Sequence, residues 1–154
     1  YCISFPDFTF SDETGPEKEA PLQEQVLMLH YLLAPNPSAG PENWIAYREI
    51  PGASFYFAAF GKRAIDPLKK AFGQNISGLA ASAGRLGGRS IRTGDAGFTF
   101  HVFPHVPVQL ILWQGDDEFA PEANILFDKS IGEILLPEDI AWLSGMLVYR
   151  LISS

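Results

Sequence analysis

The chain is poor in cysteine. Its 154 residues include one, Cys2, which excludes an internal disulfide framework and any zinc or iron–sulfur site made of several thiolates from this chain. We therefore expect no cofactor to be held through cysteine. A reducing, cytoplasmic setting fits this usage best.

Basic residues and long apolar runs are also scarce. Eleven Lys and Arg stand against 18 Asp and Glu, for a formal net charge of -7. Nucleic acid and anionic membrane surfaces both favour a basic patch, so the sequence argues against either as a partner. No apolar run reaches the ~18 residues that span a bilayer, and no basic segment precedes an apolar one at the start.

The composition otherwise indicates one ordered globular domain. Hydrophobic residues make up 47% of the chain and aromatic residues 13%, which argues against disorder. A chain of this length buries roughly two-thirds of its unfolded surface, so we expect a single domain over residues 1–154. The chain begins at Tyr1 within a β-prone run, and we expect that upstream sequence is missing.

The stretch Gly94–Asp128 is predicted to hold the centre of the fold. Two apolar, β-prone runs, Phe98–Phe103 and Val108–Trp113, are joined by Pro104–Pro107 and followed by an acidic turn. This pattern predicts an antiparallel hairpin. Trp113 ends a run that is apolar on both faces, so we expect its side chain to be mostly buried.

The remaining segments predict an α+β fold, in which an antiparallel or mixed sheet with a central β-hairpin has helices packed mainly on one face. Asp66–Pro67 is expected to start a helix and Gly73 to end it in the left-handed conformation. Ser11–Ala20 is expected to be a polar connection. The other predicted strands lie within Tyr1–Phe10, Trp44–Ile50 and Asn124–Asp128, and the predicted helices span Leu22–Leu33, Ser54–Ile65, Pro67–Phe72, Ile76–Ala83 and Pro137–Leu151.

The order of several short motifs resembles a family. They are Gly94-Asp95-Ala96, Pro104–Pro107, Leu112–Phe119 and Ile125–Asp128, preceded by His30–Leu33, Trp44-Ile45 and Arg48–Ala53. In these motifs the chain resembles the bacterial and archaeal DUF3786 family, and the likeness covers most of the sequence. The resemblance assigns no activity and no catalytic residue.

Some members of this family carry a cysteine-rich iron–sulfur module and come from anaerobes, so the resemblance implies an anaerobic redox or cofactor-related setting. With only Cys2 present, that module is absent from this chain. The association therefore cannot be transferred to any residue here, and the identity of a cofactor stays open.

Four carboxylates, Asp116, Asp117, Glu118 and Asp128, are expected near one end of the hairpin. Hard cations such as calcium and magnesium bind clustered oxygen ligands, which makes these residues candidate metal ligands. The alternative is that Gly115-Asp116 forms a turn whose carboxylates accept backbone N–H bonds. Because the spacing differs from the twelve-residue calcium loop, we favour the turn.

Histidines provide a second candidate chemistry. His101 and His105 flank the Pro104 turn, and each could act as a general base with a carboxylate such as Asp95 or Asp116. A structural, hydrogen-bonded imidazole is the alternative, and we favour it. The same alternative is favoured more strongly for His30, which lies among apolar neighbours and is expected to be buried.

A basic, glycine-rich segment, Gly84–Gly94, stands out in this acidic chain. Its arginines and backbone amides could hold a phosphate or carboxylate, although the segment lacks the lysine and Ser/Thr of a P-loop. Alternatively, Arg85 complements a helix C-terminus and the other arginines pair with Asp95 or the acidic turn. Since the segment and the acidic turn flank the hairpin, we expect their charges to gather at one end of the sheet.

These observations lead to two hypotheses of function. The first is a non-enzymatic binding or accessory domain for an anionic small molecule or cofactor, or for a partner protein. Its candidate ligand-binding residues are Arg89, Arg92, Trp113 and Asp116. The second is an enzyme that uses a histidine–carboxylate pair near the central hairpin, with His101, His105 and Asp95 as candidate catalytic residues.

Overall fold

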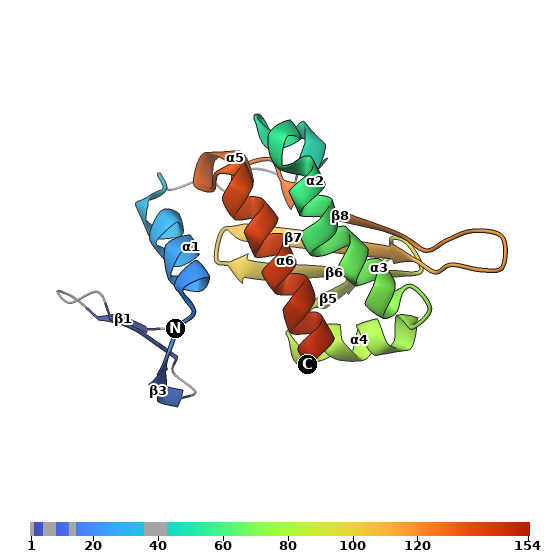
Figure 1. The fold of residues 1–154 in the computed structure, drawn as a ribbon, viewed down its shortest axis with the longest axis horizontal. Coiled ribbons are helices and arrows are strands. Elements are labelled where there is room, and N and C mark those ends of the chain that lie inside the picture. Colours follow the sequence, from blue (N-terminus) through green and yellow to red (C-terminus); the bar gives the residue numbers. More distant parts are fainter. Residues whose placement is uncertain (1, 5–8, 13–14, 36–42) are drawn as a thin grey trace.

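The protein has an α+β fold with two antiparallel sheets (Figure 1). The computed structural model describes residues 2–4, 9–12, 15–35 and 43–154. The strands are β1 (Cys2–Ser4), β2 (Thr9–Asp12), β3 (Gly15–Glu19), β4 (Trp44–Ala46), β5 (Arg89–Ile91), β6 (Ala96–Phe103), β7 (Val106–Trp113) and β8 (Glu122–Asp128). The helices are α1 (Leu22–Leu33), α2 (Phe57–Phe60), α3 (Asp66–Phe72), α4 (Ile76–Arg85), α5 (Ile131–Ile134) and α6 (Pro137–Ser153).

The central hairpin is confirmed. Strands β6 and β7 pair antiparallel from Ala96 opposite Leu112 to Phe103 opposite Val106, with a register shift near the turn. Strand β7 begins at Val106, two residues nearer the turn than the sequence indicated, so only Pro104 and His105 separate the strands. Strand β6 ends at Phe103 as predicted and is longer at its other end, where it begins at Ala96. The hairpin lies inside a five-stranded sheet of order β4-β8-β7-β6-β5, where it supplies two interior strands.

One face of this sheet carries the main core. Phe98, Phe100, Leu110, Ile125 and Phe127 alternate along three neighbouring strands and are all buried. Figure 1 shows α2, α3 and α6 on this side of the sheet. The predicted apolar stripe of the last helix faces the same core, and its buried members are Ile140, Leu143, Leu147 and Leu151. The prediction that helices cover mainly one face is therefore confirmed.

A continuous helical run differs from its prediction. A 3-10 turn at Ala53–Tyr56 leads into α2, a π-helical turn covers Gly61–Ile65, and α3 follows without a break. Asp66-Pro67 therefore does not start a separate helix. Pro67 has no N–H, and the wider π turn lets the helix continue past it.

Gly73 also behaves differently from its prediction. Its φ of -59° is right-handed, so it does not end α3 as a left-handed residue. It is required instead for close packing, because a Cβ there would lie 2.5 Å from Cγ of Pro121 and 2.4 Å from the carbonyl oxygen of Lys69.

The N-terminal segment forms a separate three-stranded sheet, β1-β2-β3. The strands predicted within Tyr1–Phe10 are confirmed as β1 and β2, which pair antiparallel. The sequence pattern also indicated a turn at Pro6-Asp7 between them, and this turn lies outside the described residues. The prediction that Ser11–Ala20 is a polar connection is wrong, since this segment contains part of β2 and all of β3. Strand pairing with β2 holds Gly15–Glu19 extended despite its low β propensity.

Two other strand boundaries also differ. The predicted strand Trp44–Ile50 is limited to β4, because Tyr47–Glu49 turns into a 3-10 helix where Glu49 accepts a hydrogen bond from the Ala46 N–H. The glycine-rich basic segment contains β5, which pairs with β6. Among the described helices, none is long and apolar enough to cross a membrane.

Candidate functional site

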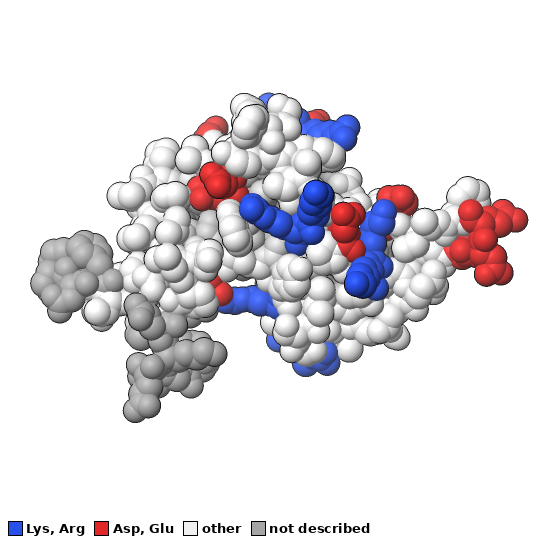
Figure 2. All heavy atoms as spheres, in the orientation of Figure 1, with Lys and Arg blue, Asp and Glu red and all other residues white. Residues whose placement is uncertain are grey.

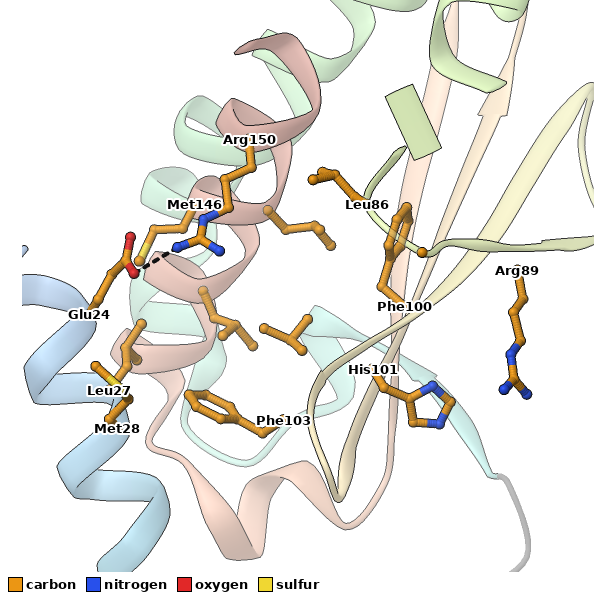
Figure 3. A pocket seen from close by; sticks show the side chains of 14 residues that line it. Glu24, Leu27, Met28, Leu86, Arg89, Phe100, His101, Phe103, Met146 and Arg150 are labelled. Atoms are coloured by element: carbon orange, nitrogen blue, oxygen red, sulfur yellow. Dashed lines mark hydrogen bonds and ion pairs between the residues drawn. The ribbon is translucent and has the colours of Figure 1, made fainter. Parts of the chain in front are cut away.

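A cavity of about 520 Å³ lies between α1, α6 and the end of β6 that approaches the Pro104 turn. This volume falls in the range of small-molecule sites. Most of its lining is apolar and includes Leu27, Met28, Phe100, Phe103, Met146 and Leu147 (Figure 3). We call it the main cavity.

Helix α1 forms one wall of the main cavity, and its two faces contact different parts of the protein. Leu27 packs with the main core, whereas Met28 belongs to a smaller cluster with Phe10 and Ala20 of the N-terminal segment. At the start of α1, Oε2 of Glu24 accepts a hydrogen bond from the Arg150 guanidinium of α6 at 2.7 Å. This ion pair ties the wall to the body of the protein (Figure 3).

Both methionines of the chain line this cavity. The sequence contains two, Met28 on α1 and Met146 on α6. Figure 3 shows them on two facing helices. Methionine is unbranched and polarizable, so it adapts to apolar and aromatic groups of different shapes.

Polar groups are confined to the edge of the cavity. Arg89 of β5 and His101 of β6 lie near each other on the outer side of the strands (Figure 3). Arg89 is exposed and forms no ion pair with any residue that the structure describes. Gly87, with a φ of 73°, brings exposed backbone to the same edge. The interior is therefore apolar, while the edge carries Arg89, whose guanidinium lies on the outer side of the strands, and the Glu24–Arg150 ion pair.

The predicted gathering of charges at one end of the sheet is present only in part. Arg92, Asp95 and Asp116 lie at the open end of the hairpin, whereas Arg89 lies opposite Thr99, nearer the Pro104 turn, and these charges form no ion pairs with one another. Oδ2 of Asp95 accepts a hydrogen bond from the Gln114 N–H at 2.8 Å. Oδ1 of Asp116 accepts from the N–H groups of Phe119 and Glu118, and these two bonds, in that order, lower the pKa of Asp116. Arg92 is exposed and forms no ion pair within the described part of the chain.

The candidate ligand-binding residues are consequently separated. Arg89 lines the main cavity. Arg92, Trp113 and Asp116 line neither this cavity nor a smaller one on the other side of Leu27. The expectation that Trp113 is mostly buried is wrong, because 40% of it is exposed. Trp113 follows the buried Leu112 on the strand, so its side chain projects to the opposite face, away from the helices.

The candidate catalytic residues lie at opposite ends of the hairpin. His101 pairs with Pro107 near the turn, whereas Asp95 precedes Ala96 at the other end. Six positions along the chain separate Asp95 from His101, or about 20 Å of extended strand. Neither His101 nor His105 forms an ion pair with a described carboxylate. The structure therefore does not bring Asp95 or Asp116 to either imidazole.

The four candidate metal ligands are also separated. Figure 2 shows acidic side chains at the tip of the β7–β8 loop, which contains Asp116, Asp117 and Glu118. Asp128 lies at the far end of β8, opposite Trp44. Within the described residues, no group of three or more His, Cys, Asp or Glu side chains could hold a metal ion.

Asp128 has a structural role at its own end of the strand. Oδ1 accepts hydrogen bonds from the backbone and hydroxyl of Ser130, and Oδ2 accepts from the Asn43 N–H. Partial burial acts to raise the pKa of Asp128, but these hydrogen bonds outweigh it and lower the pKa below its ordinary value. The carboxylate thus connects β8 to β4 and α5.

A second, smaller cavity of about 310 Å³ lies on the other side of Leu27. There Nδ1 of His30 is 2.9 Å from Oδ2 of Asp139, near the start of α6. The prediction of a hydrogen-bonded His30 is confirmed, but the expected burial is wrong, because 42% of its side chain is exposed. This is the only imidazole–carboxylate ion pair among the described residues.

Apart from Arg89 and His101, the residues that form these two cavities were not identified as site candidates from the sequence. The contacts that define them join α1 to α6, for example His30 to Asp139 and Glu24 to Arg150, more than 100 positions apart. The apolar periodicity of both helices was visible in the sequence. It indicated that each helix packs against something, but it did not indicate that they pack against each other.

Comparison with curated proteins finds no match, and neither does comparison with solved structures. A family model covers nearly the whole chain, matching residues 1–150. The resemblance carried by the motifs of the central hairpin is therefore confirmed. The chain belongs to the family described as Domain of unknown function (DUF3786).

Proposed function

We propose that the protein is a binding domain for a small molecule or cofactor that has an apolar body and an anionic group. The observation that carries this proposal is the main cavity, whose interior is apolar and whose lining includes two arginines, Arg89 and Arg150. Binding sites of this kind commonly combine an apolar lining with a few polar groups that fix orientation. The protein is proposed to bind its ligand without transforming it.

The apolar body of the ligand would lie between α1 and α6. Met28 and Met146 can adjust to its shape, and Phe100 and Phe103 offer ring surfaces from β6. Burial of an apolar body here gains roughly 25 cal/mol for each Å² removed from water. This contribution provides affinity but little selectivity for charge.

The anionic group would lie at the edge, close to Arg89. The Arg89 guanidinium has no carboxylate partner among the described residues. It can therefore form a bidentate pair with a carboxylate or phosphate of the ligand. Arg150 is a second cation on the same cavity, although Glu24 already holds it at 2.7 Å. The Arg89 guanidinium lies on the outer side of the strands (Figure 3), and β5 is the edge strand of the sheet, so the side chain would turn around this edge to reach the anionic group. Charge selectivity is assigned to Arg89 first.

Titration calorimetry with octanoate and octanol tests the proposal. The two probes share a chain length and differ in charge, so we expect octanoate to bind more tightly. Arg89→Gln should weaken octanoate binding roughly 3- to 10-fold and leave octanol binding unchanged. Leu86→Trp, which places a larger ring in the cavity from an exposed position, should weaken both.

Arg92→Gln is the matched control, because Arg92 is also exposed and unpaired among the described residues but does not line the cavity. It should leave octanoate binding as in the native protein. Equal binding of octanoate and octanol would reject the anionic part of the proposal. Binding that survives Leu86→Trp, or no binding of either probe, would reject the main cavity as the site.

A further inference from the structure

The second cavity is an open groove between α1 and the first turns of α6, which lie beside each other in Figure 1. Its apolar side consists of Leu22, Val26, Leu27 and Trp142, and its polar side consists of Gln23, His30, Glu138 and Asp139. Leu22, Val26 and Trp142 remain exposed. Apolar and acidic groups thus share one concave surface.

His30 is oriented by Asp139. The Asp139 carboxylate, with only 10% of its side chain exposed, contacts Nδ1 of His30 at 2.9 Å and also accepts the Leu136 N–H. A carboxylate only accepts hydrogen bonds, so Nδ1 is the donor. In the neutral imidazole, Nε2 is then left as an acceptor, on a ring that is partly exposed and lines the groove.

Glu138 adds a negative charge to the same groove. Its Oε2 accepts a hydrogen bond from the Tyr56 hydroxyl at 3.3 Å, and it forms no ion pair with a described residue. Arg63 is the cation beside Trp142, with its guanidinium carbon 4.3 Å from the indole centroid. Because Arg63 already covers the indole, a cationic ligand group would be held by Glu138 instead.

We propose that this groove binds a primary amine with an apolar body. An ammonium group has three N–H donors and no acceptor, and the groove offers acceptors of the matching kind, the Glu138 carboxylate and Nε2 of His30. The apolar body would lie against Val26, Leu27 and Trp142. This site is separate from the main cavity and does not depend on the function proposed for it.

The selectivity for amines follows from the charges. An alcohol of the same length has one O–H donor and no charge, so it gains the apolar contacts but loses the attraction to Glu138. A carboxylate has no donor and would be repelled by Glu138 and Asp139. The expected order of affinity is therefore amine, alcohol, carboxylate, which differs from the order expected for the main cavity.

Nuclear magnetic resonance titrations with hexylamine, hexanol and hexanoate test this proposal. Hexylamine should shift the Trp142 indole N–H resonance and the α1 amides around Val26. Glu138→Gln should weaken hexylamine binding roughly fivefold and leave hexanol binding unchanged. Val26→Trp, which fills the groove from an exposed position on α1, should remove the binding of both.

Glu133→Gln is the matched control, because Glu133 is an exposed carboxylate on α5 that does not line the groove. Its hexylamine affinity should equal that of the native protein. An equal loss in Glu133→Gln and Glu138→Gln would mean diffuse attraction to an acidic surface and would overturn the proposal. Equal affinities for hexylamine and hexanol, or no shift at Trp142, would also overturn it.

Discussion

Tyr47 joins the core to the start of α6 through its hydroxyl. The residue is 1% exposed, stacks on Phe60 with ring centroids 4.2 Å apart, and donates a hydrogen bond to the Pro137 carbonyl at 2.7 Å. Burial, and then the charge of an ionised Tyr56, raise the pKa of Tyr47 to about 12. Ionisation of this phenol therefore opposes the folded state.

The consequence is a loss of stability at high pH. Because the folded pKa lies above the ordinary value of about 10, the stabilisation is complete below pH 10. It should be lost as pH rises toward 12, by roughly 2–3 kcal/mol in the free energy of unfolding. Urea melts at pH 9 to 11.5 measure this slope.

Tyr47→Phe should cost about 1 kcal/mol at neutral pH, because the hydrogen bond to Pro137 is lost, and should flatten the alkaline slope. Tyr149→Phe, at a position that is 56% exposed, is the control and should keep the slope of the native protein. If both variants show the native slope, the alkaline loss does not come from Tyr47.

Trp113 illustrates the limit of reasoning at the level of single residues. Its strand is apolar on both faces, so the sequence did not indicate which face of the sheet the helices cover. Leu112 is fully buried while 40% of Trp113 is exposed, because neighbouring strand residues face opposite sides. Truncating Trp113 is therefore expected to cost less than truncating a core residue.

Two helix-associated glycines should respond in opposite directions to alanine. Gly84 lies in α4, and an added Cβ would meet nothing within 4 Å. Gly84→Ala should therefore stabilise the protein by roughly 0.5–1 kcal/mol through helix propensity and a smaller unfolded-state entropy. An added Cβ at Gly73 would meet Pro121 and Lys69, so Gly73→Ala should destabilise it by roughly 1–3 kcal/mol.

Denaturant melts of both variants measure these changes in the free energy of unfolding. Gly61→Ala is a useful second comparison, because nothing lies within 4 Å of its added Cβ either, although its helical turn is of the π type. A Gly73→Ala protein as stable as the native one would show that the β7–β8 loop moves away from α3 at little cost.

Elements with strong local signals were predicted well. Helices α1, α4 and α6 were found from apolar spacing, and β6 with β7 from two β-prone runs joined by a short proline turn. The elements that were missed depend on partners distant in the sequence. Strand β5 exists because it pairs with β6, and β3 because it pairs with β2. Local composition instead favoured loops for both.

The candidate site depends even more on distant contacts. Its walls come from α1 near the start of the chain and α6 at the end, and the ion pair that joins them connects residues 126 positions apart. The acidic residues that were prominent in the sequence lie in turns, where Asp95 and Asp116 accept backbone hydrogen bonds. Of the candidate ligand-binding residues, Arg89 alone lines a described cavity.

At the scale of the whole molecule, α1 should open more readily than the central sheet. It is attached to α6 by Leu27 and by the pairs Glu24–Arg150 and His30–Asp139, each of which has at least one largely exposed partner. Strand β7 is paired on both sides and mostly buried. Regions with few buried contacts open locally without global unfolding.

Hydrogen–deuterium exchange measures this difference directly. Amides of α1 should exchange faster than those of β7, and Glu24→Gln should speed exchange in α1 while leaving β7 unchanged. Glu122→Gln, which breaks the Lys69–Glu122 ion pair on another side of the protein, is the matched control and should leave α1 unaffected. Octanoate, if it binds against α1 in the main cavity, should slow α1 exchange. Parallel acceleration of α1 and β7 in Glu24→Gln would instead show that α1 opens only when the whole domain unfolds.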